Sequence, residues 1–378
     1  MTNPQPCTLF KRRQFLVSSG AALSAGLAGC AWSQATTPAP MLRLIGETRL
    51  PHKLQYQNST VGGLSGIDFD AASGVLYLLS DDGGSQSPPR FYTARLAMTA
   101  DKLGDIELTG ATFLQGLTSP DPEAIRWHAP SQSLLWTSEG NALLLAPPSL
   151  QQTRRDGTLV RTFELPAMLG FGLLSGSRVN KTFEGLAITP DGQSAWLAME
   201  AALRQDGPEP TLQAPGGPCR FTQMDIATGK AVRQIAYVPD AIARAPSPPT
   251  ADADNGVVEV LMLDAHRMLV LERAYMAGLG DKDRNSMRLY AVDTRQGSDT
   301  LNVPALKPGN HTPAPKTLVA DFASFPALSR LDNTEGMCWG PNLPGLHGKP
   351  GKRTLLFVSD DNFNPRQITQ FLAFEFLE

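Results

Sequence analysis

The sequence predicts an all-β fold, and three observations support this prediction. The chain contains 34 Gly and 31 Pro among its 378 residues, which is high for a helical protein. Its apolar residues come in short runs between turn signals, which is the pattern of β-strands joined by tight connections. A unit made of two such runs returns at irregular intervals of roughly 50 to 80 residues, which indicates a repeated architecture with long insertions.

Five short apolar runs are the clearest strands of the sequence. They cover residues 75–80, 134–137, 195–200, 268–272 and 355–359. Each follows a turn signal, and each ends at or beside Ser, Thr, Asp or Glu. Another apolar run lies upstream of several of them, as at residues 66–70 and 185–189. The repeated unit is therefore an acidic motif, a strand, a turn and a second strand that finishes in a polar residue.

Such strand pairs cannot bury both of their faces alone, and radial stacking of four-stranded blades would bury them. We therefore predict a single β-propeller, with six blades as the first expectation, five or seven as alternatives, and a pair of β-sandwiches as the alternative fold. Segments rich in Pro and Gly are expected to be long surface loops. They lie at about residues 203–218, 240–256, 304–316 and 340–353.

The N-terminus indicates export. Arg12 and Arg13 precede an uncharged stretch that is too short for a comfortable membrane span, and Leu27-Ala28-Gly29-Cys30 matches a lipobox. We expect residues 1–29 to be a twin-arginine lipoprotein signal peptide, residues 30–45 an anchor and linker, and residues 46–378 the propeller domain. The alternative is an ordinary cleaved signal or a hydrophobic first helix. The mature protein is thus expected in the periplasm or cell envelope, held to the membrane through a lipid on Cys30.

Charge and cysteine content limit the partners. The net charge is −3 and the basic residues are scattered, which argues against nucleic acid and against a polybasic membrane patch. We expect a monomer that acts on a small molecule. Cys219 and Cys338 are the cysteines left to pair in an oxidising compartment, as a disulfide or as two buried thiols.

The acidic motifs carry the chemistry of the predicted site. Equivalent strands of a propeller point the same way, so motifs at equivalent blade positions converge on one end of the central channel. Several carboxylates there would repel one another unless a cation neutralised them. Oxygen ligands from Asp, Glu and Asn suit calcium better than zinc. The alternative is that these motifs only form turns and cap strands.

Six segments, in this order, resemble the phytase-like β-propeller family described as having esterase-like activity. The resemblance extends from about residue 62 to residue 376 and rests on residues 63–67, 79–82, 121–124, 180–186 with 199–200, 333–337, and 358–363 with 367–371. It implies a propeller, export and a calcium-dependent hydrolase of ester or phosphoester bonds.

Two familiar hydrolytic mechanisms find no motif in the chain. An Arg-His-Gly-x-Arg phosphatase motif is absent from the sequence, and so is the Gly-x-Ser-x-Gly motif of serine esterases. The mechanism that stays compatible with the sequence is metal-assisted hydrolysis. In this mechanism calcium polarises a phosphoryl or acyl oxygen and a carboxylate activates water. The competing class is a non-catalytic propeller, stabilised by metal, that binds a protein, a glycan or an envelope component.

Specific residues are expected in these roles. The catalytic carboxylates are Glu184 and Glu335. The groups that offset charge on an anionic substrate are Lys181, Arg126 and Arg366. The metal ligands are Glu123, Glu184, Glu335, Asp361, Asp82 and Asn362.

Overall fold

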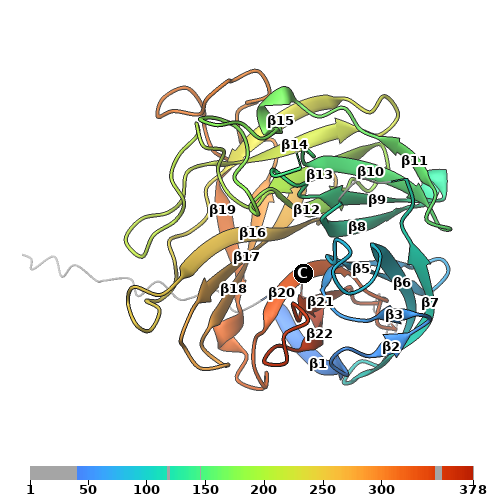
Figure 1. Ribbon diagram of the computed structural model, residues 1–378. Helices are drawn as coiled ribbons and strands as arrows, with labels where there is room; N and C mark the ends of the chain where they lie inside the picture. The colour runs from blue at the N-terminus through green and yellow to red at the C-terminus, as the bar shows by residue number, and fades with distance from the viewer. Residues whose placement is uncertain (1–40, 117–119, 145, 345–350, 378) are drawn as a thin grey trace, which may run out of the picture. The chain divides into compact units, whose positions relative to one another are not determined.

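A computed structural model describes residues 41–116, 120–144, 146–344 and 351–377 of the chain. Five four-stranded antiparallel sheets are arranged in a ring in this part (Figure 1). The predicted β-propeller is therefore confirmed. The expected signal peptide and Cys30 lie outside the described residues. None of the described helices has the length and apolar character needed to cross a membrane.

Each of the first four blades is built from four consecutive strands. Blade 1 contains β4 (Leu64–Asp70), β5 (Val75–Ser80), β6 (Arg90–Met98) and β7 (Leu103–Phe113). Blade 2 contains β8 (Pro122–His128), β9 (Ser133–Ser138), β10 (Ser149–Arg154) and β11 (Leu159–Thr162). Blade 3 contains β12 (Phe183–Ile188), β13 (Ser194–Met199), β14 (Cys219–Asp225) and β15 (Ala231–Tyr237). Blade 4 contains β16 (Ala253–Met262), β17 (Arg267–Met276), β18 (Asn285–Asp293) and β19 (Lys316–Asp321).

The fifth blade joins the two ends of the described chain. It contains β20 (Asn333–Trp339), β21 (Thr354–Asp360), β22 (Thr369–Phe376) and β1 (Leu42–Leu50). β1 pairs with β22 from Leu42 opposite Phe376 to Leu50 opposite Thr369, so backbone hydrogen bonds close the ring. This strand begins at Leu42, four residues before the domain boundary expected at residue 46.

Smaller elements complete the fold. They are the hairpin β2 (Gln55–Tyr56) and β3 (Ser59–Thr60), and three short helices at Ala129–Ser131, Ala167–Leu169 and Phe322–Ser324. None of them forms part of a blade.

The blade number is five, one of the stated alternatives, and not the six expected first. The five strands expected from apolar runs are the second strands of the five blades, β5, β9, β13, β17 and β21, apart from Glu200, which follows β13. Long connections lie within two of the blades, from β13 to β14 in blade 3 and from β18 to β19 in blade 4. These insertions lengthen blades 3 and 4, so each of them takes up more of the chain than its four strands require.

The innermost strand of each blade faces the central channel. β4, β8, β12, β16 and β20 contact one another in this order around the ring, and β20 contacts β4. Apolar side chains fill the space between blades, for example Trp196, Phe221 and Val270 in one buried cluster. Because all five inner strands run in the same direction, their starts meet at one end of the channel.

Candidate functional site

A strongly acidic cavity of about 530 Å³ lies where the inner strands begin. Carboxylates from all five blades or the segments that precede them line it: Asp81, Asp121, Glu123, Glu139, Glu184, Glu200, Asp254, Glu335 and Asp360. Three basic residues line it as well, namely Lys181, Arg273 and Arg284. Carboxylates far outnumber cations, so the cavity is suited to bind positive charge.

A β-bulge near the start of the inner strand in blades 3 and 5 positions the first group of carboxylates. The register against the second strand shifts between Phe183 and Gly185 in blade 3, and between Thr334 and Gly336 in blade 5. A register shift also occurs at the start of the inner strands of blades 1 and 2, and midway along that of blade 4, between Val257 and Glu259. A bulge leaves one residue unpaired and redirects its side chain, and in blades 3 and 5 that residue is Glu184 or Glu335.

Each of these two glutamates is followed by a glycine because the neighbouring strand leaves no room for a side chain at that position. A Cβ atom at Gly336 would lie 2.6 Å from the carbonyl oxygen of Ser65, and one at Gly185 would lie 3.0 Å from the backbone nitrogen of Val260. The neighbouring inner strand therefore approaches too closely for a larger side chain. The Glu-Gly motif of the sequence combines a bulge that presents a carboxylate with a contact between blades.

A second group of carboxylates lies at or just after the end of the second strand in blades 1, 2, 3 and 5. Asp81 follows β5, Glu139 follows β9, Glu200 follows β13, and Asp360 is the last residue of β21. Blade 4 has Arg273 at the equivalent position, opposite Gly256 of its inner strand. None of these five residues was among the expected site residues, although the expected strands ended at or beside acidic residues. That strand-end pattern is the signal that could have found four of them.

Two sets of carboxylates are close enough to share cations. One oxygen each from Asp121, Glu123 and Glu139 lie within 4.8 Å of one another, and so do oxygens from Glu139, Glu184 and Glu200. Glu139 belongs to both sets and is almost fully buried. Its carboxylate also accepts a hydrogen bond from the backbone N–H of Thr182.

The electrostatics of the cavity reflect this crowding. Burial raises the pKa of Asp121 to about 6 and, together with the charge of Glu200, that of Glu139 to about 8. Burial and neighbouring carboxylates raise the pKa values of Glu123 and Glu184 well above the ordinary range. Each group resists ionisation because burial and the neighbouring carboxylates disfavour its charged form, and at Glu184 Arg273 opposes this effect without reversing it.

Asp81 and Asp360 behave in the same way on the other side of the ring. Burial is the main cause that raises both pKa values, and repulsion between neighbours adds to it, from Asp360 on Asp81 and from Glu335 on Asp360. Burial also raises the pKa of Glu335 to about 7, although Arg273 opposes the shift.

The basic residues occupy one sector of the cavity. Lys181 Nζ lies 3.3 Å from Glu200 Oε1 and 3.1 Å from Asp254 Oδ2. Arg273 Nη2 lies 3.6 Å from Glu335 Oε1. Burial opposes the charge of both cations, but the surrounding carboxylates raise their pKa values, so both stay charged. The cavity therefore has an acidic sector centred on Glu139 and a mixed sector around Arg273.

The structure brings five of the expected site residues together and separates four others. Glu123, Glu184, Glu335, Lys181 and Asn362 line the cavity. Asp82, Asp361, Arg126 and Arg366 do not line it.

Asp82 and Asp361 hold loops in place. The carboxylate of Asp82 accepts hydrogen bonds from the backbone of Gly84 to Ser87 and pairs with buried Arg90 at 2.8 Å. Asp361 accepts hydrogen bonds from the backbone N–H groups of Gly63 and Phe363 and lies 3.3 Å from His52. The oxygens of both residues are thus used by the fold itself.

Arg126 is buried in the middle of the channel and does not face the cavity. Its guanidinium pairs with Glu259 and donates hydrogen bonds to the carbonyls of Ile67, Val260 and Met337, which belong to three inner strands. Its role is to hold the ring together.

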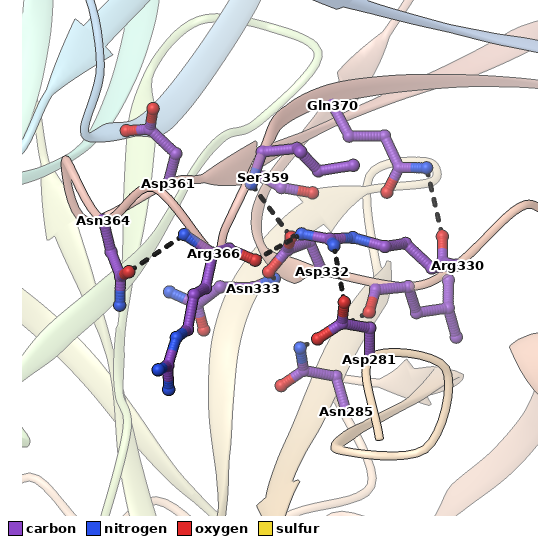
Figure 2. A network of polar contacts seen from close by, with 12 residues as sticks. Asp281, Asn285, Arg330, Asp332, Asn333, Ser359, Asp361, Asn364, Arg366 and Gln370 are labelled. Atoms are coloured by element: carbon purple, nitrogen blue, oxygen red, sulfur yellow. Dashed lines mark hydrogen bonds and ion pairs between the residues drawn. The ribbon is translucent and has the colours of Figure 1, made fainter. Parts of the chain in front are cut away.

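Arg366 takes part in a neighbouring network through its backbone. Its carbonyl accepts hydrogen bonds from Arg284 and Arg330, while its own side chain is directed away from Arg330 and Asp332 (Figure 2). Fully buried Asp332 pairs with both of these arginines and accepts from the backbone N–H of Ile368. This network fixes the loop after β21, which contributes Asn362 and Asn364 to the cavity.

Cys219 and Cys338 are free, buried thiols on different blades. The alternative of a disulfide between them is therefore not realised in the structure.

The chain matches the family model described as "Phytase-like: Esterase-like activity of phytase" over residues 59–363. No curated protein matches its sequence. Among solved structures, hydrazine synthase of Kuenenia stuttgartiensis is 12% identical, with 81% of this chain and 80% of the other covered and a TM-score of 0.35. The periplasmic gluconolactonase PpgL of Pseudomonas aeruginosa is also 12% identical, with 84% and 87% covered and a TM-score of 0.35. At these TM-scores neither likeness supports a conclusion about activity.

Proposed function

Since the chain belongs to the phytase-like family, we propose that its acidic cavity is the active site of a calcium-dependent hydrolase of ester or phosphoester bonds. The observation that carries this proposal is the pair of carboxylate sets that share Glu139. All the donors are oxygens, and among the described residues the cavity lining contains no His or Cys. Such a donor set fits calcium and does not fit zinc.

The two sets suggest two cations joined by one carboxylate. Asp121 and Glu123 would hold the first with Glu139, and Glu184 and Glu200 would hold the second with the same Glu139. When bound, calcium supplies positive charge that polarises a substrate oxygen and makes bound water more acidic. The raised pKa values of these carboxyl groups support this assignment, because two cations would remove the repulsion that raises them.

Glu335 is the residue we assign as general base. It lies in neither carboxylate set, so its oxygens are free of the ligand role. Its pKa of about 7 is suited to accept a proton from water near neutral pH. Asn333 Nδ2 donates a hydrogen bond of 2.9 Å to Glu335 Oε1 and fixes the carboxylate at the cavity wall. Glu184, the other expected catalytic residue, is assigned to the metal.

Arg273 and Lys181 are assigned to the substrate. Both are cationic and line the cavity. Arg273 lies 3.6 Å from the base Glu335, and Lys181 pairs with Glu200 and Asp254. An anionic oxygen of a phosphoester, or the oxyanion that develops on an ester, would be stabilised there. Two or three cations are few for a densely charged polyphosphate, which supports a substrate with a single anionic group.

Turnover of p-nitrophenyl acetate and p-nitrophenyl phosphate by the purified protein tests this proposal. We expect hydrolysis of one of them with calcium, and a loss of about 100-fold or more with a chelator or in Glu335→Gln. Glu107→Gln, an exposed carboxylate on β7, is the matched control and should leave turnover unchanged. Full activity after chelation would overturn the metal mechanism. A calcium-dependent rise in melting temperature without turnover of either substrate would instead favour the non-catalytic, metal-stabilised propeller.

Location outside the cytoplasm is part of the proposal, and it rests on the sequence of residues 1–30. Export would expose the cavity to a compartment where calcium is plentiful. Incorporation of a labelled fatty acid in cells, lost in Cys30→Ala, tests the lipid anchor.

A further inference from the structure

Two connections at the cavity end of the propeller hold large apolar side chains out in solvent. Leu143 and Leu144, between β9 and β10, are 93% and 62% exposed. Leu173 and Leu174, between β11 and β12, are 93% and 87% exposed. Of the ten large apolar side chains that are exposed in the described part of the chain, five lie on these two connections, the fifth being Val179. Of the other five, Met41 and Leu377 are neighbours joined by a backbone hydrogen bond, and Val160, Leu212 and Val232 lie on separate elements. The concentration on the two connections calls for an explanation that isolated exposed residues do not.

Both connections are fixed by hydrogen bonds near their apolar tips. The side chain of Asn141 accepts from the backbone N–H groups of Leu143 and Leu144, each at 3.1 Å, and its backbone pairs with Ala146. In the second connection Ser177 donates from its hydroxyl to the carbonyl of Leu169 at 2.6 Å and from its backbone to that of Gly170. The leucines therefore lie on loops held by hydrogen bonds, although exposing their apolar side chains to water is unfavourable in free energy.

The bases of the two connections meet at the cavity. Glu139, which lines the cavity, lies four residues before Leu143, and Lys181, which also lines it, lies within the second connection, just before β12 begins at Phe183. The hydroxyl of Thr182 donates to the carbonyl of Glu139 at 3.2 Å, and its backbone N–H donates to the Glu139 carboxylate. Both connections thus start from the cavity wall at blades 2 and 3 and carry their leucines outward into solvent.

We propose that this site takes an amphiphile: an ester or phosphoester whose polar group enters the cavity and whose alkyl or acyl chain lies against Leu143, Leu144, Leu173 and Leu174. This inference rests on the proposed function, because the metal-loaded cavity must hold the polar group. A wholly polar substrate would leave the leucines in water, and a wholly apolar one would leave the carboxylates and cations without partners. A molecule with one polar end and one apolar end satisfies both surfaces.

Binding of dodecylphosphocholine below its micelle concentration, compared with phosphocholine, tests the inference without requiring turnover. Titration calorimetry of the full chain with calcium should show about tenfold or greater preference for the dodecyl compound. The double variant Leu143→Ser/Leu173→Ser should lose most of this preference and keep its affinity for phosphocholine. Val160→Ser/Val232→Ser replaces exposed apolar residues on outer strands and is the matched control, with the preference unchanged.

Equal affinity for the two compounds in the unaltered protein, binding of neither, or a preference that survives the leucine substitutions would overturn the inference. Dimerisation that the same substitutions abolish would assign the leucines to a second copy of the chain and would also overturn it. Failure of the proposed hydrolase is recognised separately, as absence of turnover of short-chain substrates while the chain-length preference in binding persists.

Discussion

The guanidinium of Arg126 and the carboxylate of Glu259 form a buried ion pair, with 2.8 Å between Nη2 and Oε2, that links all five inner strands of the propeller. Arg126 belongs to β8 and donates to carbonyls of β4, β16 and β20, while Glu259 of β16 accepts from the backbone N–H of Leu186 in β12. A single pair of charges therefore connects every blade at the middle of the channel.

Removal of one partner should destabilise the fold strongly. Arg126→Met leaves Glu259 buried without its cation, and we expect a loss of about 3–5 kcal/mol in the free energy of unfolding. Urea unfolding followed by circular dichroism measures it. Arg295→Met removes an exposed arginine that pairs with Asp293 and should leave the unfolding midpoint unchanged. An equally small effect for Arg126→Met would contradict the central role of the pair.

Stability without metal should decrease as pH rises. The pKa values of Asp121, Glu335 and Glu139 in the folded protein are about 6, 7 and 8, above those of the unfolded chain. The folded protein therefore holds more protons than the unfolded chain between about pH 5 and pH 8, so its stability is greatest at the acidic end of this window and is lost towards the alkaline end. Thermal melts in chelator should show this fall, and excess calcium should flatten it. A chelated protein that becomes more stable from pH 5 to pH 8 would contradict the prediction.

The carboxylate that both sets share should matter most for calcium. Glu139→Gln removes a carboxylate that belongs to both sets, whereas Glu123→Gln removes one that belongs to a single set. Calorimetric titration should give about two calcium ions per chain, with one weakened in Glu123→Gln and both weakened by about tenfold or more in Glu139→Gln. Equal effects of the two substitutions would argue against a shared ligand. Glu107→Gln should bind calcium normally.

Arg273 should affect binding of anionic substrates. Its replacement by Ala removes a cation from the sector that contains Glu335, and we expect KM for p-nitrophenyl phosphate to rise by about tenfold or more. KM for the neutral p-nitrophenyl acetate should change less, because the charge on that substrate develops only during the reaction. Steady-state kinetics on the two substrates separates these effects, and equal changes in both KM values would contradict the assignment.

The contact between blades 5 and 1 should not tolerate a methyl group. Gly336→Ala places a Cβ 2.6 Å from the carbonyl oxygen of Ser65, and we expect a destabilisation of about 1–3 kcal/mol. Gly280→Ala is the matched control, because no atom lies within 4 Å of its added Cβ and its φ is not positive. Denaturant unfolding of the two variants measures the difference. A neutral Gly336→Ala would show that the strands can separate at no cost.

Paired aspartates mark the limit of what the sequence could predict about the site. Asp81 and Asp82 are adjacent, and the second was expected to bind metal, yet Asp81 lines the cavity while Asp82 pairs with Arg90. Asp360 and Asp361 divide in the same way. Successive residues at the end of a strand point to opposite sides, so the motif locates the pair and the register of the strand decides which member faces the channel.

The sequence by itself determined the all-β class, the second strand of every blade and the Glu-Gly motifs of Glu184 and Glu335, because alternating turns and apolar runs are local properties of the chain. Only the tertiary structure decided that there are five blades, that β1 closes the ring, and that Glu139 lies within reach of two sets of carboxylates. Those features depend on loop lengths and on contacts between residues far apart in sequence. Arg126 shows the difference most clearly: its charge was visible in the sequence, but only the packing of five inner strands around it made it a structural centre and kept it out of the cavity.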